Sequence, residues 1–137
     1  MVLVGPGQAN DSPVFPELLG RLSVARCGPG RPRTTPAAVL ADKAYSARSH
    51  RALLRARGIK AVIPEPSDQV RNRRRRGSRG GRPPAFDAEA YRDRNVVERS
   101  FNTVKQWRGL ATRYDKLAIV YRGAAVLRAI TIWLRHL

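Results

Sequence analysis

The chain has 137 residues, about the length of one domain, and its 27 Lys and Arg against 10 Asp and Glu give a net charge of +17. A balance this basic favours a polyanionic partner, with nucleic acid ahead of an anionic membrane surface. One cysteine and two distant histidines exclude an internal disulfide framework and a structural zinc site. No apolar run is long enough to predict a membrane span. The single cysteine suits a reducing compartment, so we expect a cytoplasmic protein.

Residues 1–36 form the first of four predicted segments. They combine an apolar run at 1–4, which we expect to be an edge strand, with a Gly- and Pro-rich loop and a short helix over 14–22. A second cluster of Gly and Pro at 28–33 predicts another loop.

Residues 37–64 predict a strand, a helix and a second strand. The apolar run 38–42 is the first strand, Ser46 is expected to cap the helix and Gly58 to end it, and 59–63 form the second strand. Two apolar strands around a helix predict a parallel pair. Functional residues sit at the carboxyl ends of such strands, and Asp42 falls at one of them.

Residues 65–86 are rich in arginine and have no apolar periodicity. We expect a mobile or disordered loop unless an anion binds it, and in this context the arginines are predicted to track DNA phosphates. The alternative is a charge run that is merely solvated. The arginines are Arg71, Arg73, Arg74, Arg75, Arg76, Arg79 and Arg82.

Residues 87–137 are predicted to be helical. Asp87 is expected to cap a helix that runs to Trp107, with Gly109 near its end, and another helix begins near Leu117. The second helix is expected to bury one apolar face and to end the domain. That face consists of Val120, Gly123, Leu127, Ile130 and Leu134.

Four polar residues of the first of these helices share one narrow band. Tyr91, Arg94, Glu98 and Lys105 are separated by 3, 4 and 7 residues, which places them on one face of a continuous helix. An amphipathic helix with ordinary ion pairs would show the same spacing. The apolar residues expected to anchor the band to a core are Val97, Phe101 and Val104.

Two aromatic residues near this band have alternative interpretations. Trp107 and Tyr114 can stack on an extruded nucleobase or pack in the core, and core packing is favoured. Trp133, on the apolar C-terminal helix, is expected in the core.

The spacing Tyr91-x2-Arg94-x3-Glu98-x6-Lys105 matches at all four positions the Tyr/Arg/Glu/Lys signature of bacterial insertion-sequence transposases of the DDE type. Four further segments resemble these enzymes in the same order, so that the resemblance covers nearly the whole chain. They are residues 39–45, 58–64, 76–83 and 105–114.

The resemblance implies an α/β fold with an RNase-H-like mixed sheet, in which three acidic residues surround two divalent ions, Mg²⁺ or Mn²⁺. Asp42 would be the second acid and Glu98 the third, and their carboxylates would lie close together. Arg94 and Lys105 would contact DNA phosphates near the cut, and Tyr91 would position the strand. The DNA partner would be the terminal repeats of an insertion sequence, bound by a nucleoid-associated protein that is a homo-oligomer when complete.

One departure from the family pattern concerns the first acid, which the family carries on an upstream strand. The upstream carboxylate here, Asp11, lies in a turn-forming sequence that explains it better than metal binding does. We therefore expect the C-terminal portion of a transposase, N-terminally truncated and without the central strand. The alternatives are an inactive remnant, a half that is completed by the upstream half of the transposase, and a non-catalytic basic module that binds nucleic acid.

Overall fold

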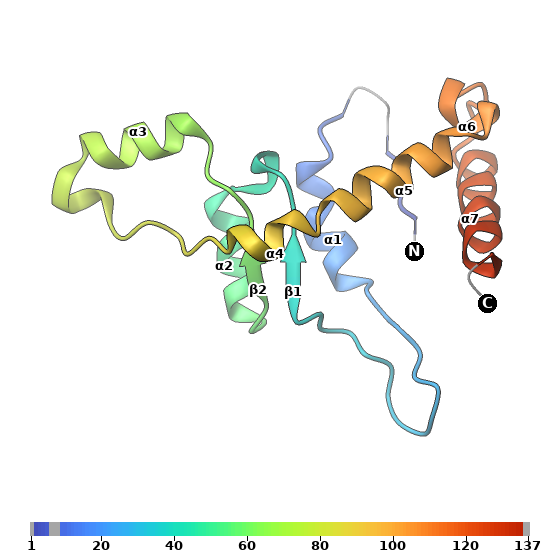
Figure 1. Ribbon diagram of the computed structural model, residues 1–137, viewed down its shortest axis with the longest axis horizontal. Helices are drawn as coiled ribbons and strands as arrows, with labels where there is room; N and C mark the ends of the chain where they lie inside the picture. Colours follow the sequence, from blue (N-terminus) through green and yellow to red (C-terminus); the bar gives the residue numbers. More distant parts are fainter. Residues whose placement is uncertain (1, 6–8, 136–137) are drawn as a thin grey trace. The chain divides into compact units, whose positions relative to one another are not determined.

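A computed structural model describes residues 2–5 and 9–135 of the chain. These residues form two compact units, although length alone suggests one domain. The α/β unit consists of Ser12–Arg94, and the helical unit consists of Met1–Asp11 with Asn95–Leu137. Figure 1 shows the elements of each unit in the colours of the sequence.

The α/β unit alternates short helices with two strands. Its two strands and their crossover helix confirm the strand, helix and strand expected between 37 and 64. The elements are the 3-10 turn η1 (Ser12–Val14), α1 (Phe15–Gly20), β1 (Ala38–Leu40), η2 (Lys43–Tyr45), α2 (Arg48–Ala56), β2 (Lys60–Val62), α3 (Ser67–Arg75), η3 (Gly77–Gly80) and α4 (Ala88–Arg92).

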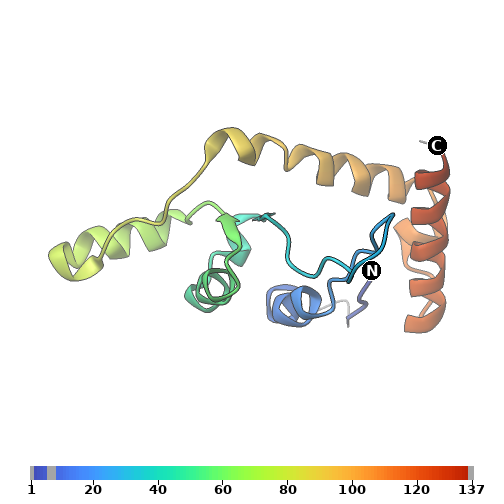
Figure 2. The ribbon, with the colours of Figure 1, turned by 90° about the horizontal axis from the view of Figure 1, so that it is seen from below.

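The sheet is a parallel pair, as predicted. Ala38 pairs with Lys60 and Leu40 with Val62. Helices α1 and α2 lie on one side of this sheet and α4 on the other (Figure 2). The core forms on the α1–α2 side because each element there presents apolar side chains to the sheet. The core consists of Phe15, Leu19, Leu54, Ile59 and Ile63.

The start of α2 differs from the prediction. Ala47, not Ser46, occupies the position before the helix, and no side chain caps it. Ser46 is buried instead, and its hydroxyl donates to Oε1 of Gln69 at 2.8 Å. The predicted end is confirmed: Gly58 has φ 66°, a left-handed conformation that suits glycine and ends α2.

The arginine-rich segment is not a loop, because α3 and η3 occupy most of it. Asp68 lies in the first turn of α3 and arginines lie in its last turn, an arrangement that suits the helix dipole. Arg73 also forms an ion pair with Glu65, and both side chains are 17% exposed. These electrostatic contacts stabilise a helix that the sequence does not predict, because the segment has no apolar periodicity.

The helical unit contains α5 (Asn95–Lys105), α6 (Arg108–Thr112) and α7 (Ala118–Leu134). The predicted single helix from Asp87 to Trp107 is wrong, because α4 ends at Arg92 and α5 begins at Asn95. Asp93 and Asn95 favour such a break, since short polar side chains compete for backbone hydrogen bonds. Gly109 lies within α6 rather than at a helix end.

The face by which α7 packs is also different from the predicted one. Arg128 is buried, whereas Leu127 is 58% and Ile130 45% exposed. The apolar residues of α7 itself lie on all sides of the helix, so their periodicity does not select one face to be buried. The other residues predicted for the buried face, Val120, Gly123 and Leu134, are exposed as well.

Three further expectations need correction. Residues 2–5 form no strand, and Met1 lies outside the described residues. Val97 and Phe101 of α5 are exposed rather than anchored in a core, and the aromatic residues Tyr114 and Trp133 are exposed as well.

In the part of the chain that the structure describes, no helix is long and apolar enough to cross a membrane.

Asp87 fixes the start of α4 and carries a testable pH dependence. Its carboxylate accepts hydrogen bonds from Lys60 Nζ at 2.7 Å and from the Ala90 N–H at 2.9 Å, which lower its pKa below the ordinary 3.8. A lowered folded-state pKa adds stability that is present above the unfolded value and is lost as pH falls through the folded one.

We therefore expect Asp87→Asn to speed hydrogen exchange at the Ala90 amide near neutral pH. The difference from the wild type should shrink once pH falls well below 3.8, because the wild-type carboxyl is then protonated. A difference that stays constant across this range would show that the charge of Asp87 does not stabilise α4.

Candidate metal and nucleic-acid site

Asp42 lies immediately beyond the carboxyl end of β1, as predicted. The Ala41 N–H continues the ladder to the Val62 carbonyl at 3.3 Å, and the chain then leaves the sheet. Oδ1 of Asp42 accepts the Ala44 N–H at 3.0 Å and so starts η2. The half-buried carboxylate is held by its own backbone, and Oδ2 has no protein partner among the described residues.

Glu65 is a second carboxylate at the same edge of the sheet, and sequence reasoning did not select it. It follows β2 by three residues, and parallel strands end at the same edge. Its Oε1 forms the ion pair with Arg73. Glu65 therefore orders the arginine-rich segment, and the position after an apolar strand was the signal that could have found it.

The arginine-rich hairpin, defined as α3 with η3, presents a cluster of cations. Arg75, Arg76 and Arg79 surround a cavity of about 470 Å³. Arg71, Arg74 and Arg82 are also exposed, whereas Arg73 is half-buried against Glu65. The structure thus separates one structural arginine from six that are open to a ligand.

Gly80 allows the hairpin to close. A Cβ at this position would lie 2.2 Å from the Arg73 carbonyl oxygen. Only glycine permits this close approach of η3 to the last turn of α3. The hairpin is therefore a folded element, and its arginines occupy defined positions.

Tyr91 and Arg94 lie together in the α/β unit. The Arg94 guanidinium lies over the Tyr91 ring, with its carbon 5.8 Å from the centroid, and the Arg94 N–H donates to the Tyr91 carbonyl at 3.1 Å. Phe86 packs on Tyr91 with the two ring centroids 5.3 Å apart. Both predicted DNA-contact residues are thus half-buried and positioned by neighbours.

Glu98 and Lys105 belong to the helical unit, in the first and last turns of α5. Seven residues separate them, which places both on one face of that helix. The break at 93–94 means that the four predicted residues do not share one continuous helix. The close approach of Asp42 and Glu98 stays a prediction, since they lie in separate units.

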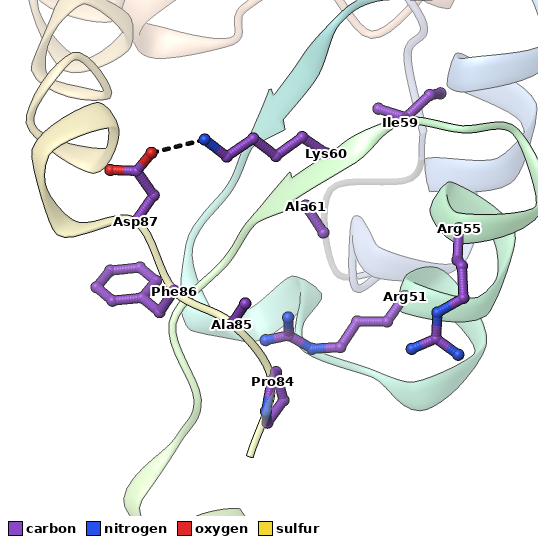
Figure 3. A pocket seen from close by; sticks show the side chains of 9 residues that line it. All are labelled: Arg51, Arg55, Ile59, Lys60, Ala61, Pro84, Ala85, Phe86 and Asp87. Carbon is purple, nitrogen blue, oxygen red and sulfur yellow. Dashed lines mark hydrogen bonds and ion pairs between the residues drawn. The ribbon is translucent and has the colours of Figure 1, made fainter. Parts of the chain in front are cut away.

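The α/β unit also contains a basic pocket of about 520 Å³, which the sequence did not predict (Figure 3). Arg51 and Arg55 line one wall, and Lys60, bound to Asp87, lines another. The Arg51 Nη2 donates to the Ile63 carbonyl at 2.8 Å; burial lowers the Arg51 pKa, and the Glu65 charge opposes this. The spacing of Arg51 and Arg55 along α2 was the available signal.

The donor set at the sheet edge suits a hard divalent cation. Asp42 offers a carboxylate oxygen on a fixed backbone, and Mg²⁺ is usually bound by one or two carboxylates together with substrate phosphates. Among the described residues, no three His, Cys, Asp or Glu side chains gather into a metal-binding group. Asp42 thus fits as one ligand of such an ion.

An acid just beyond the carboxyl end of a parallel strand lies where α/β proteins bind their ligands. Comparisons with known proteins define the class further. The family model described as "Transposase DDE domain" matches residues 1–134. A Brucella ovis protein (strain ATCC 25840 / 63/290 / NCTC 10512), described as a candidate transposase for insertion sequence element IS6501, is 32% identical over 130 residues. The match covers 95% of this chain and 84% of that protein. No solved structure matches significantly.

The chain therefore belongs to the transposase DDE domain family. This confirms the family that the Tyr/Arg/Glu/Lys spacing and the four ordered segments indicate. The mixed α/β architecture with its parallel strand pair is consistent with that family.

Proposed function

We propose that the chain acts in DNA transposition, as the DNA-binding part of a metal-dependent transposase that cleaves and joins phosphodiesters at the ends of an insertion sequence. The position of Asp42 carries this proposal: a backbone-anchored carboxylate ends a parallel strand in a chain of the DDE family. The fold proposed for the complete catalytic domain is RNase-H-like.

Asp42 and Glu98 are the proposed metal ligands. Carboxylate oxygens are the ligands that Mg²⁺ and Mn²⁺ prefer. A pair of bound ions would activate the attacking hydroxyl and stabilise the leaving oxygen of the phosphodiester. The anchoring of Asp42 through the Ala44 N–H orients the carboxylate, since Oδ1 is fixed while Oδ2 stays available.

The proposed DNA contacts come from exposed or half-exposed cations. Arg71, Arg74, Arg75, Arg76, Arg79 and Arg82 would bind the phosphate backbone, because five of these exposed guanidinium groups lie on the hairpin and the sixth, Arg82, follows it by two residues. Arg94, stacked on Tyr91, and Lys105 would hold phosphates near the reacting bond. For Arg73 we propose a structural role in place of the DNA contact expected from sequence, because its guanidinium is bound to Glu65.

Further parts of the proposal concern partners. The first of the three acids would come from an upstream portion of the transposase, and the complete enzyme would be a homo-oligomer bound to terminal repeats in the nucleoid. The Brucella ovis relative, whose description refers to an insertion sequence element, supports this choice of DNA.

Mn²⁺ binding tests the proposed ligands. We expect Asp42→Asn and Glu98→Gln each to weaken Mn²⁺ binding about tenfold or more in the presence of duplex DNA, because each replaces a charged oxygen of a proposed ligand with a neutral one. The measurement is the loss of the free-ion signal in electron paramagnetic resonance.

Glu89→Gln is the matched control, because Glu89 is an exposed glutamate on α4 outside the proposed site. It should leave Mn²⁺ binding unchanged. Equal Mn²⁺ affinity in the wild type and both site variants would contradict the proposed metal site.

A further inference from the structure

Arg128 is a cation buried in the helical unit, with only 3% of its surface exposed. Its Nε and Nη2 donate to the Thr103 carbonyl at 3.2 and 2.9 Å, and Nη2 also donates to Oε1 of Gln106 at 3.0 Å. Thr103 lies in the last turn of α5, where the helix dipole is negative, and its carbonyl also accepts the Gln106 N–H at 3.4 Å. Arg128 therefore caps α5 from α7.

The same guanidinium lies against Trp107, with its carbon 5.4 Å from the ring centroid. Cation–π attraction favours this geometry, and burial of the charge strengthens it. The Trp107 side chain is nevertheless 37% exposed, so the expectation of core packing is wrong. Arg128 supports the indole, and part of the ring stays accessible.

The backbone of Trp107 is fixed as well. Its N–H donates to the Val104 carbonyl at 3.2 Å, and its carbonyl accepts the N–H groups of Leu110 and Ala111, both at 3.0 Å. Trp107 thus joins the end of α5 to the start of α6. The ring is held before any ligand arrives, which lowers the entropy lost on stacking.

Two exposed cations flank this ring in the sequence. Lys105 is the last residue of α5 and Arg108 the first of α6. An aromatic ring between basic residues is the arrangement by which proteins bind single-stranded nucleic acid: the ring stacks on a base, and the cations bind adjacent phosphates.

We propose that Trp107, supported by Arg128, is a stacking site for one unpaired nucleobase of DNA. The site rests on the proposed function, because that function supplies DNA as the partner. Arg128 is a positioning residue in this site, since it acts through the indole and its guanidinium is occupied by protein acceptors. Trp107 contacts the base.

Fluorescence quenching tests the stacking site in the Trp133→Phe background, where Trp107 is the remaining tryptophan. We expect a short oligodeoxythymidylate to quench Trp107, and a matched abasic oligomer of equal charge to quench it much less. Trp107→Leu should weaken oligodeoxythymidylate binding at least about fivefold and leave binding of the abasic oligomer and of duplex DNA unchanged.

Arg128→Lys tests the positioning role, because lysine keeps the charge and loses the planar fork. In the Trp133→Phe background, it should shift Trp107 emission and reduce the preference for the base-bearing oligomer relative to Trp133→Phe alone. Equal binding of both oligomers by the wild type, or no effect of Trp107→Leu, would overturn the stacking site. If the wild-type protein binds none of these DNAs, the result would instead contradict the proposed function.

Discussion

Replacing Arg74, Arg75, Arg76 and Arg79 with alanine is expected to weaken binding to all duplex DNA sequences alike. It should also reduce the slope of log K against log salt concentration by up to about 3.6, since each neutralised phosphate contributes about 0.9. Between 50 and 200 mM salt, the variant would then lose roughly a hundredfold less affinity than the wild type. The physical reason is that these guanidinium groups lie exposed on one folded hairpin.

The control for this experiment removes charge elsewhere in the same unit. Arg26 and Arg31 are exposed arginines outside the hairpin, and their replacement by alanine should change the slope much less per residue. Fluorescence anisotropy over a salt series measures both variants. An unchanged slope in the hairpin variant would move the DNA surface elsewhere on the chain.

The hairpin also shows why part of the structure could not be predicted from sequence. Sequence patterns report apolar periodicity, and residues 65–86 have none. Their helix depends on contacts that form only in three dimensions. Arg73 forms an ion pair with Glu65, and the Ser46 hydroxyl donates a hydrogen bond to Gln69, which is 23 residues away in the chain.

The strand pair could be predicted because its signals are local. The apolar runs that contain β1 and β2 are short and bounded by breakers, and the helix between them ends at Gly58. The placement of Asp42 follows directly, since an acid after such a run must lie at the strand end. Asp87 as a cap is equally local, and the structure confirms it.

In the helical unit, periodicity selected the wrong face of α7. The apolar side chains of that helix lie on all of its sides, and its buried residue is the charged Arg128, which donates to Thr103 and Gln106 and lies against Trp107. A buried arginine reverses the usual rule that charge marks the exposed face. The same contacts hold Trp107, so the sequence could offer base stacking by Trp107 only as an alternative to core packing.

The second large effect concerns Asp42 and Glu98. We expect Asp42→Asn and Glu98→Gln each to lower the transposition frequency of an intact element encoding this chain by at least about a hundredfold. Metal ligation supplies several kcal/mol of transition-state stabilisation, and an amide oxygen lacks the charge of a carboxylate. Both variants should still bind duplex DNA, because the hairpin arginines are unchanged.

The transposition frequency of these variants is also the most direct test of the proposed function. A donor plasmid with the intact element is compared across the wild type, Asp42→Asn, Glu98→Gln and the Glu89→Gln control, with protein levels matched by immunoblot. The predicted result is a near-complete loss in both site variants, together with wild-type DNA binding and normal frequency in the control. Wild-type frequency in Asp42→Asn or in Glu98→Gln would contradict a metal-dependent role for these carboxylates.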